Sequence, residues 1–209
     1  MTTFVDKSTE DAVTDLFSAS DFTDDLHLYL GLDPAVSSAN QPIDVEGLLR
    51  DALSIAEQDQ WRSILSKDVT LSLPYRAFCA NDNKIYLPYG QVNSITSFTY
   101  QDADSADQTL TEGTDFTLYS YEPAYLWAEN WFNLMDLNST EPEVVSIVYN
   151  TGYTAFNQVP RSTLSALKIM CYHLFNSRDD TNKSDITPMA YRHTVTQAMA
   201  NSRRCTEFA

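Results

Sequence analysis

The sequence predicts an α+β fold in which a small helical bundle carries a β-rich insertion and has extended N- and C-terminal arms. Apolar residues recur at helical spacing before residue 64 and after residue 160, whereas they alternate with polar residues between these regions. Both ends of the chain are rich in polar and charged residues. Hydrophobic residues make up 43% of the 209-residue chain, which is enough to bury a sizeable core.

The N-terminal part is predicted to contain an arm and two helices. Residues 1–22 are polar and acidic, which is typical of a loose arm. A short helix over residues 24–32 ends before Pro34, because the residue ahead of a proline disfavours the helical conformation. A longer helix over about residues 44–64, with its end near Trp61 or Ile64, begins at Asp44, whose carboxylate can accept a free backbone N–H. The apolar face of this longer helix consists of Val45, Leu48, Leu49, Ala52 and Ala56.

Residues 68–150 are predicted to form the β-rich insertion, because β-branched and aromatic residues alternate with polar ones there. Residues 102–113 are expected to be an acidic loop, and residues 121–142 an irregular aromatic region. The expected strands are 68–73, 84–87, 94–101, 115–120 and 144–150.

A third helix is expected over residues 160–176, where Pro160 in the first turn removes no needed hydrogen bond. The main domain would therefore span residues 23–180. Residues 181–209 combine a polar linker with a short amphipathic stretch, which indicates a C-terminal docking tail.

The charge of the chain is strongly negative and unevenly distributed. The net charge is −16, and residues 1–60 contain 13 acidic and 2 basic residues. Residues 161–209 reverse the sign, with 7 basic and 4 acidic residues. Because an acidic body repels the phosphate backbone, nucleic-acid binding by the whole chain is disfavoured. The basic C-terminal region indicates either a segment that binds an acidic surface or a change of charge along the chain that serves only solubility.

The sequence lacks the motifs of the common enzyme classes. Its five glycines are too far apart for a phosphate-binding loop or a nucleophile elbow. Its three histidines form no metal-binding pair, and its three cysteines form no CxxC motif. Cys171 falls on the apolar face of the third helix, which predicts a buried thiol. We therefore expect no catalytic residue, no cofactor and no metal. The sequence also has no secretory signal and no membrane-spanning stretch.

Two weaker signals leave alternatives open. Residues 102–107 imitate the start of a calcium-binding EF-hand, but the loop lacks the required glycine at its sixth position and glutamate at its twelfth. An acidic hairpin loop is the better prediction. Five aromatic residues could stack on a sugar, although core or subunit-interface packing is more typical of such a group. They are Tyr121, Tyr125, Trp127, Trp131 and Phe132.

The order of these elements resembles the head–tail connector (adaptor, or head-completion) family of tailed bacteriophages. The resemblance covers residues 22–180. It depends on several motifs that occur together in this order, since no single motif is diagnostic of the family. The stretches that carry it are residues 22–30, residues 48–61, residues 85–88 followed by 92–100, and Val148-Tyr149-Asn150-Thr151-Gly152-Tyr153 followed by Val159-Pro160 and a helix.

The resemblance implies a structural ring subunit, of twelve copies as a rule, at the head–tail junction of a virion assembled in the host cytoplasm. Its partners would be further copies of itself, the portal protein, and the tail or the next neck protein. DNA would pass through the channel without specific binding. No catalysis, cofactor or membrane is implied. The alternatives are another neck or tail-completion protein of a phage, or an acidic carbohydrate-active enzyme.

Two groups of residues are candidates for these contacts. Acids that could face the channel and repel DNA are Asp44, Glu46, Asp51, Glu57 and Asp59. Tail residues that could bind a partner through an apolar stripe and basic anchors are Met189, Arg192, Val195, Met199, Arg203 and Arg204.

Overall fold

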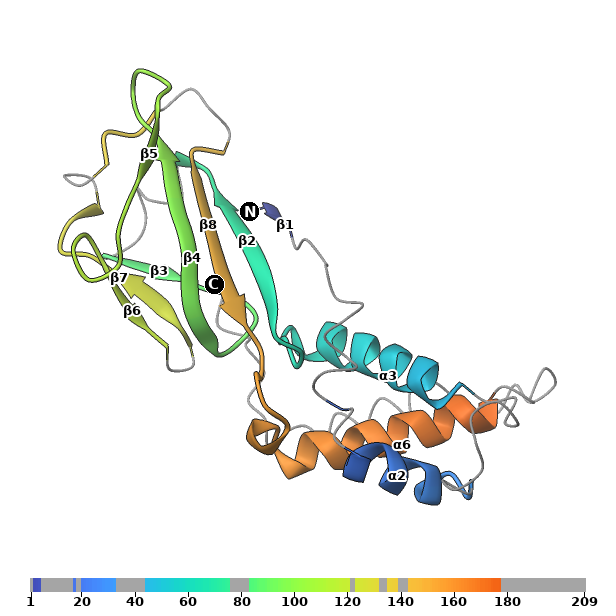
Figure 1. The fold of residues 1–209 in the computed structure, drawn as a ribbon. Coiled ribbons are helices and arrows are strands. Elements are labelled where there is room, and N and C mark those ends of the chain that lie inside the picture. Colours follow the sequence, from blue (N-terminus) through green and yellow to red (C-terminus); the bar gives the residue numbers. More distant parts are fainter. Residues whose placement is uncertain are drawn as a thin grey trace. The chain divides into compact units, whose positions relative to one another are not determined.

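The chain divides into two compact units, one built from strands and one from helices (Figure 1). The computed structural model describes residues 2–4, 17, 20–32, 44–75, 83–120, 123–131, 135–138 and 143–177. Of these, residues 2–4 and 65–152 belong to the strand unit, and residues 17–64 and 153–177 belong to the helical unit. The fold is thus of the predicted α+β class, with the β-rich region inserted between helices.

The helical unit is held together by apolar stripes. Its elements are α2 (Ser20–Tyr29), α3 (Val45–Gln60), the short 3₁₀ helix η2 (Phe156–Gln158) and α6 (Arg161–Ser177). Both α2 and α3 pack against α6, as the spacing of apolar residues predicts. The side chains buried there include Phe22, Leu26, Leu48, Leu49, Ala52, Leu53, Ala56, Ala166, Leu167 and Met170.

Helix α3 begins where predicted and ends near the earlier of its two predicted ends. At its start, the Asp44 carboxylate accepts the Gly47 N–H at 2.8 Å. At its end, Trp61 adopts the left-handed conformation (φ 53°, ψ 37°), which turns the chain out of the helix. The Glu57 carboxylate then accepts the Ile64 N–H at 2.6 Å. Of the two predicted ends, the one near Trp61 is confirmed and the one at Ile64 is wrong, because these local hydrogen bonds replace a further turn.

The strand unit contains two antiparallel sheets (Figure 1). The larger has the order β1-β2-β8-β4-β5 and the smaller the order β3-β7-β6. The strands of the larger sheet are β1 (Thr2–Phe4), β2 (Lys67–Leu73), β8 (Val145–Thr151), β4 (Val92–Gln101) and β5 (Asp107–Thr109). Those of the smaller sheet are β3 (Lys84–Tyr86), β7 (Tyr125–Trp127) and β6 (Thr117–Tyr119).

One hydrophobic core joins the two sheets. Side chains of β2, β4 and β8 that point to one face pack with the inward side chains of the small sheet, as Val69, Ile147 and Leu126 do. Three aromatic rings form the centre of this core, because the Phe98 ring lies 5.3 Å from Phe116 and 5.7 Å from Trp131. Aromatic pairs at such distances add to the energy of burial.

Three short strands were not predicted. Thr2–Phe4 falls in the expected N-terminal arm, Asp107–Thr109 in the expected acidic loop, and Tyr125–Trp127 in the expected irregular region. Each is three residues long and is defined by hydrogen bonds to a neighbouring strand. All three residues of β5 are exposed, so no alternation of apolar residues could reveal it.

Gly152 ends strand β8 in a conformation that a side chain would disturb. Its φ is +99°, and a Cβ atom would lie 2.1 Å from the backbone oxygen of Leu65. The Asn93 side chain also donates to the Gly152 carbonyl at 2.8 Å. The position therefore requires both a positive φ and an unobstructed close approach of two backbone segments.

We expect Gly152→Ala to lower the free energy of unfolding by more than about 2 kcal/mol, because it combines a strained dihedral with a backbone clash. The matched control is Gly113→Ala, where φ is +84° but no atom lies within 4 Å of the added Cβ. This control should lose about 1 kcal/mol from the dihedral alone. Urea denaturation of both variants measures the difference, and equal losses would contradict the steric explanation.

Candidate assembly surfaces

The outer face of the small sheet carries a row of aromatic side chains. Tyr86, Tyr125 and Tyr119 lie directly opposite one another on β3, β7 and β6. Trp127 projects from the same face, because side chains two residues apart share a face of a strand. We call Tyr86, Tyr119, Tyr125 and Trp127 the sheet aromatic face. The residues between them, such as Ile85 and Leu126, point into the core.

The rings of this face contact one another while staying accessible to solvent. Tyr119 and Tyr125 stack at 4.8 Å with an interplanar angle of 13°, and Tyr86 lies 5.9 Å from Tyr125. The Lys84 ammonium lies 4.8 Å from the centre of the Tyr125 ring. The exposed fractions of Tyr86, Tyr119 and Trp127 are 40%, 39% and 39%. Clustered exposed aromatic residues are typical of protein interfaces.

A second exposed cluster lies on the helical unit. Leu28, Tyr29 and Tyr172 are 65%, 47% and 45% exposed. The Tyr29 and Tyr172 rings meet edge to face at 5.9 Å, which joins α2 to α6 at the surface. We call these three residues the helix patch. Asp24 precedes Leu28 by four residues, so it lies on the same side of α2, and it is exposed.

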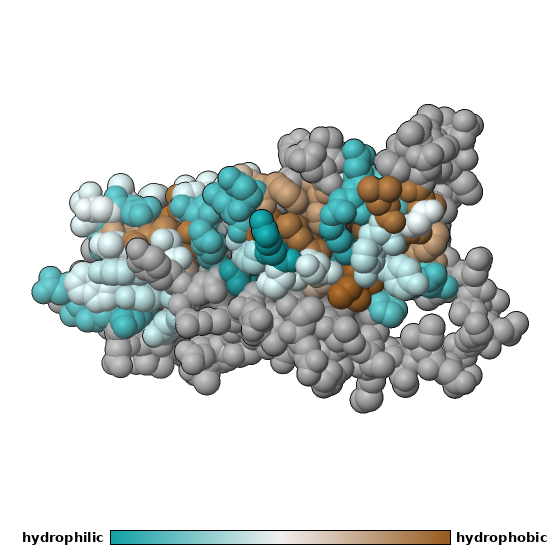
Figure 2. All heavy atoms as spheres, turned by 90° about the horizontal axis from the view of Figure 1, so that it is seen from below, coloured by the Kyte–Doolittle hydropathy of each residue, from teal (hydrophilic) through white to brown (hydrophobic). Residues whose placement is uncertain are grey.

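Charged residues of both signs lie beside the helix patch. Asp25 forms an ion pair with Lys168 of α6. The Lys168 ammonium also lies 5.4 Å from the centre of the Phe22 ring. Figure 2 shows hydrophobic residues reaching the surface at several separate places among hydrophilic ones.

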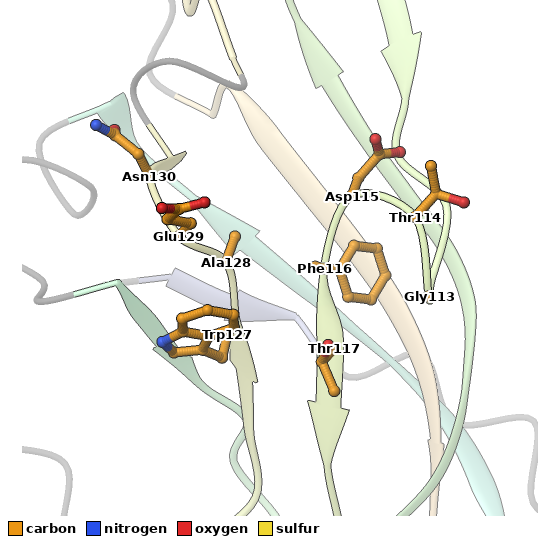
Figure 3. Close-up of a pocket in the computed structure, with 9 residues that line it drawn as sticks. All are labelled: Gly113, Thr114, Asp115, Phe116, Thr117, Trp127, Ala128, Glu129 and Asn130. Carbon is orange, nitrogen blue, oxygen red and sulfur yellow. The ribbon is translucent and has the colours of Figure 1, made fainter.

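An open cleft of about 730 Å³ adjoins the start of β6 and the end of β7. It forms where the two strands diverge beyond their last pair, Thr117 and Trp127. Asp115 and Glu129 stand on opposite walls of the cleft (Figure 3). However, the Asp115 carboxylate accepts the Thr111 N–H at 2.8 Å and so stabilises its own turn. This arrangement gives no specific support for a pair of catalytic carboxylates.

The five aromatic residues considered as a sugar platform do not form one surface. Trp131 is buried in the core against Phe98, whereas Tyr125 and Trp127 belong to the sheet aromatic face. Tyr121 and Phe132 lie outside the described residues. The structure therefore divides this group between core and surface.

The candidate channel acids of α3 do not share one side of the helix. Asp44, Glu46 and Asp51 are exposed, whereas Glu57 is half-buried and bonds to Ile64. At 100° per residue, Glu46 and Asp51 point about 140° apart around the helix axis. The side chain of Asp59 lies outside the description. A channel-facing role for these acids stays a prediction.

The tail candidates Met189, Arg192, Val195, Met199, Arg203 and Arg204 also lie outside the described residues. Their role in binding a partner stays a prediction.

In the loop that resembles the start of an EF-hand, the first carboxylate binds the backbone of the loop itself. The Asp102 carboxylate accepts the N–H groups of Asp104 and Ala106 at 3.0 and 2.9 Å and a Gln108 side-chain bond at 2.8 Å. The Gln108 bond, followed by the backbone bonds, lowers the pKa of Asp102. The described residues contain no cluster of three or more side chains suited to holding a metal ion.

Cys171 is buried as predicted, and its environment makes it unreactive. Burial raises the pKa of its thiol to about 12, so the group stays protonated near neutral pH. No helix in the described part of the chain is long and apolar enough to cross a membrane.

Sequence reasoning singled out Tyr125 and Trp127 as possible platform or interface residues, but it missed Tyr86, Tyr119 and the helix patch. The available signal for the sheet aromatic face was a tripeptide pattern, Lys84-Ile85-Tyr86, Thr117-Leu118-Tyr119 and Tyr125-Leu126-Trp127. Each tripeptide has one apolar residue between two outward-facing ones. Strands were predicted at the first two tripeptides but not at the third, and the sequence did not show that the three pair side by side.

Comparison with solved structures relates the fold to particle necks. A chain of the neck of an empty gene transfer agent (GTA) particle, computed with C6 symmetry, aligns with a TM-score of 0.66 and 15% identity over 95% of both chains. A chain of the neck of a native GTA particle, computed with C12 symmetry, aligns with a TM-score of 0.63 and 16% identity. That alignment covers 95% of this chain and 94% of the other.

This chain has the fold of those neck structures. A chain of the virion of a native GTA particle also aligns, with a TM-score of 0.61 and 15% identity over 94% of each chain. The likeness agrees with the resemblance to head–tail connectors found in the sequence. No protein-family model and no curated protein matches the sequence.

The aromatic row generates a prediction about stability. Tyr125→Ala removes two ring contacts, whereas Tyr86→Ala removes one. Because each cross-strand aromatic pair contributes about 0.2–1 kcal/mol, Tyr125→Ala should cost about twice as much as Tyr86→Ala. Urea denaturation measures both, and a larger loss for Tyr86→Ala would contradict the arrangement.

Proposed function

We propose that this chain is a structural neck protein of a tailed, phage-like particle and lies at the head–tail junction of the virion. The observation that carries the proposal is the extent of the structural likeness. The same fold covers 95% of this chain and 95% of a chain in a GTA neck. A match of this extent involves both the strand unit and the helical unit, so it does not rest on one common motif.

The finer proposal is that several copies form a ring that joins the portal to the tail and surrounds the DNA channel. The neck structures that share the fold were computed with C6 and C12 symmetry, which supports a ring of identical subunits. A dodecamer is the number implied by the family resemblance. A closed ring requires each copy to present two different surfaces, one to each neighbour.

A structural role is also supported by the chemistry of the described residues. The thiol of Cys171 is held protonated, and the Asp102 and Asp115 carboxylates bond to their own loops. The net charge of −16 suits a conduit through which DNA slides, because repulsion of the phosphates prevents adhesion.

The proposal is tested by locating the chain in the particle. The chain is expressed with an added epitope, particles are purified, and antibody-bound gold is imaged. Labels at the head–tail junction are expected. Labels on the tail tip or head shell, or particles that lack the chain, would contradict the proposal.

The C-terminal segment is proposed to attach the subunit to the portal or to an adjacent copy. It combines the apolar residues Met189, Val195 and Met199 with the basic residues Arg203 and Arg204 in an otherwise acidic chain. Basic groups steer the encounter with an acidic partner surface, and apolar burial then stabilises the contact.

Deletion of residues 186–209 should leave the melting temperature of the purified protein within about 2 °C of the full chain, because a docking segment adds little to the domain core. The same deletion should abolish attachment to portal-bearing heads, measured by co-sedimentation. A protein that melts much earlier yet still attaches would place the segment in the core instead.

A further inference from the structure

We draw no further inference here: the strongest candidate, the sheet aromatic face on the outer side of the small sheet, adjoins both the Lys84 ammonium and the carboxylates of Asp115 and Glu129, so nothing in the structure shows what covers it.

Discussion

The strand unit depends on the antiparallel pairing of β8 with both β2 and β4. This central strand pairs with Lys67–Leu73 on one side and with Val92–Gln101 on the other. Each of these partners lies more than 40 residues before β8 in the sequence. A polar network on Asn150 reinforces the same three strands. The Asn150 side chain accepts hydrogen bonds from Ser66 and Asn93 and donates one to Asp68. The tight approach at Gly152 then ends the strand.

The position of the small sheet follows from this arrangement. The inward faces of β2, β4 and β8 provide an apolar surface, which the residues Ile85, Leu118 and Leu126 of the small sheet help to cover. Because side chains alternate along a strand, covering that surface forces the neighbouring tyrosines outward. The sheet aromatic face is thus a geometric consequence of core burial. It gives an otherwise acidic chain a surface suited to contact with another protein.

The absence of catalytic motifs in the sequence and the local use of carboxylates in the described structure are consistent with each other. Asp44, Glu57, Asp102 and Asp115 all accept backbone N–H groups near their own positions in sequence. Acidic side chains here stabilise helix ends and turns, which is a structural use of charge. The remaining acidic residues contribute to the net charge of −16.

The sequence by itself determined the fold class, the three helices and the longer strands. The apolar stripe from Val45 to Ala56 repeats at 3.6 residues, and the alternation in residues 68–73 repeats at two, so both follow from local geometry. The resemblance to head–tail connectors also came from sequence order, and the likeness to GTA neck structures agrees with it. The burial of Cys171 was likewise predictable from its place on an apolar helix face.

Only the tertiary structure decided which aromatic residues are core and which are surface. Trp127 and Trp131 are four residues apart and chemically alike, yet one is exposed on a strand and the other is buried against Phe98. The three-residue strands β1, β5 and β7 are defined by their pairing with other strands, which the periodicity of so short a segment cannot detect. Strand β1 pairs with the distant β2, β5 pairs with the preceding β4, and β7 pairs with both the preceding β6 and the distant β3. The alignment of Tyr86, Tyr125 and Tyr119 depends on strand register. Register is set by long-range pairing and core packing, because one face of each strand must be buried.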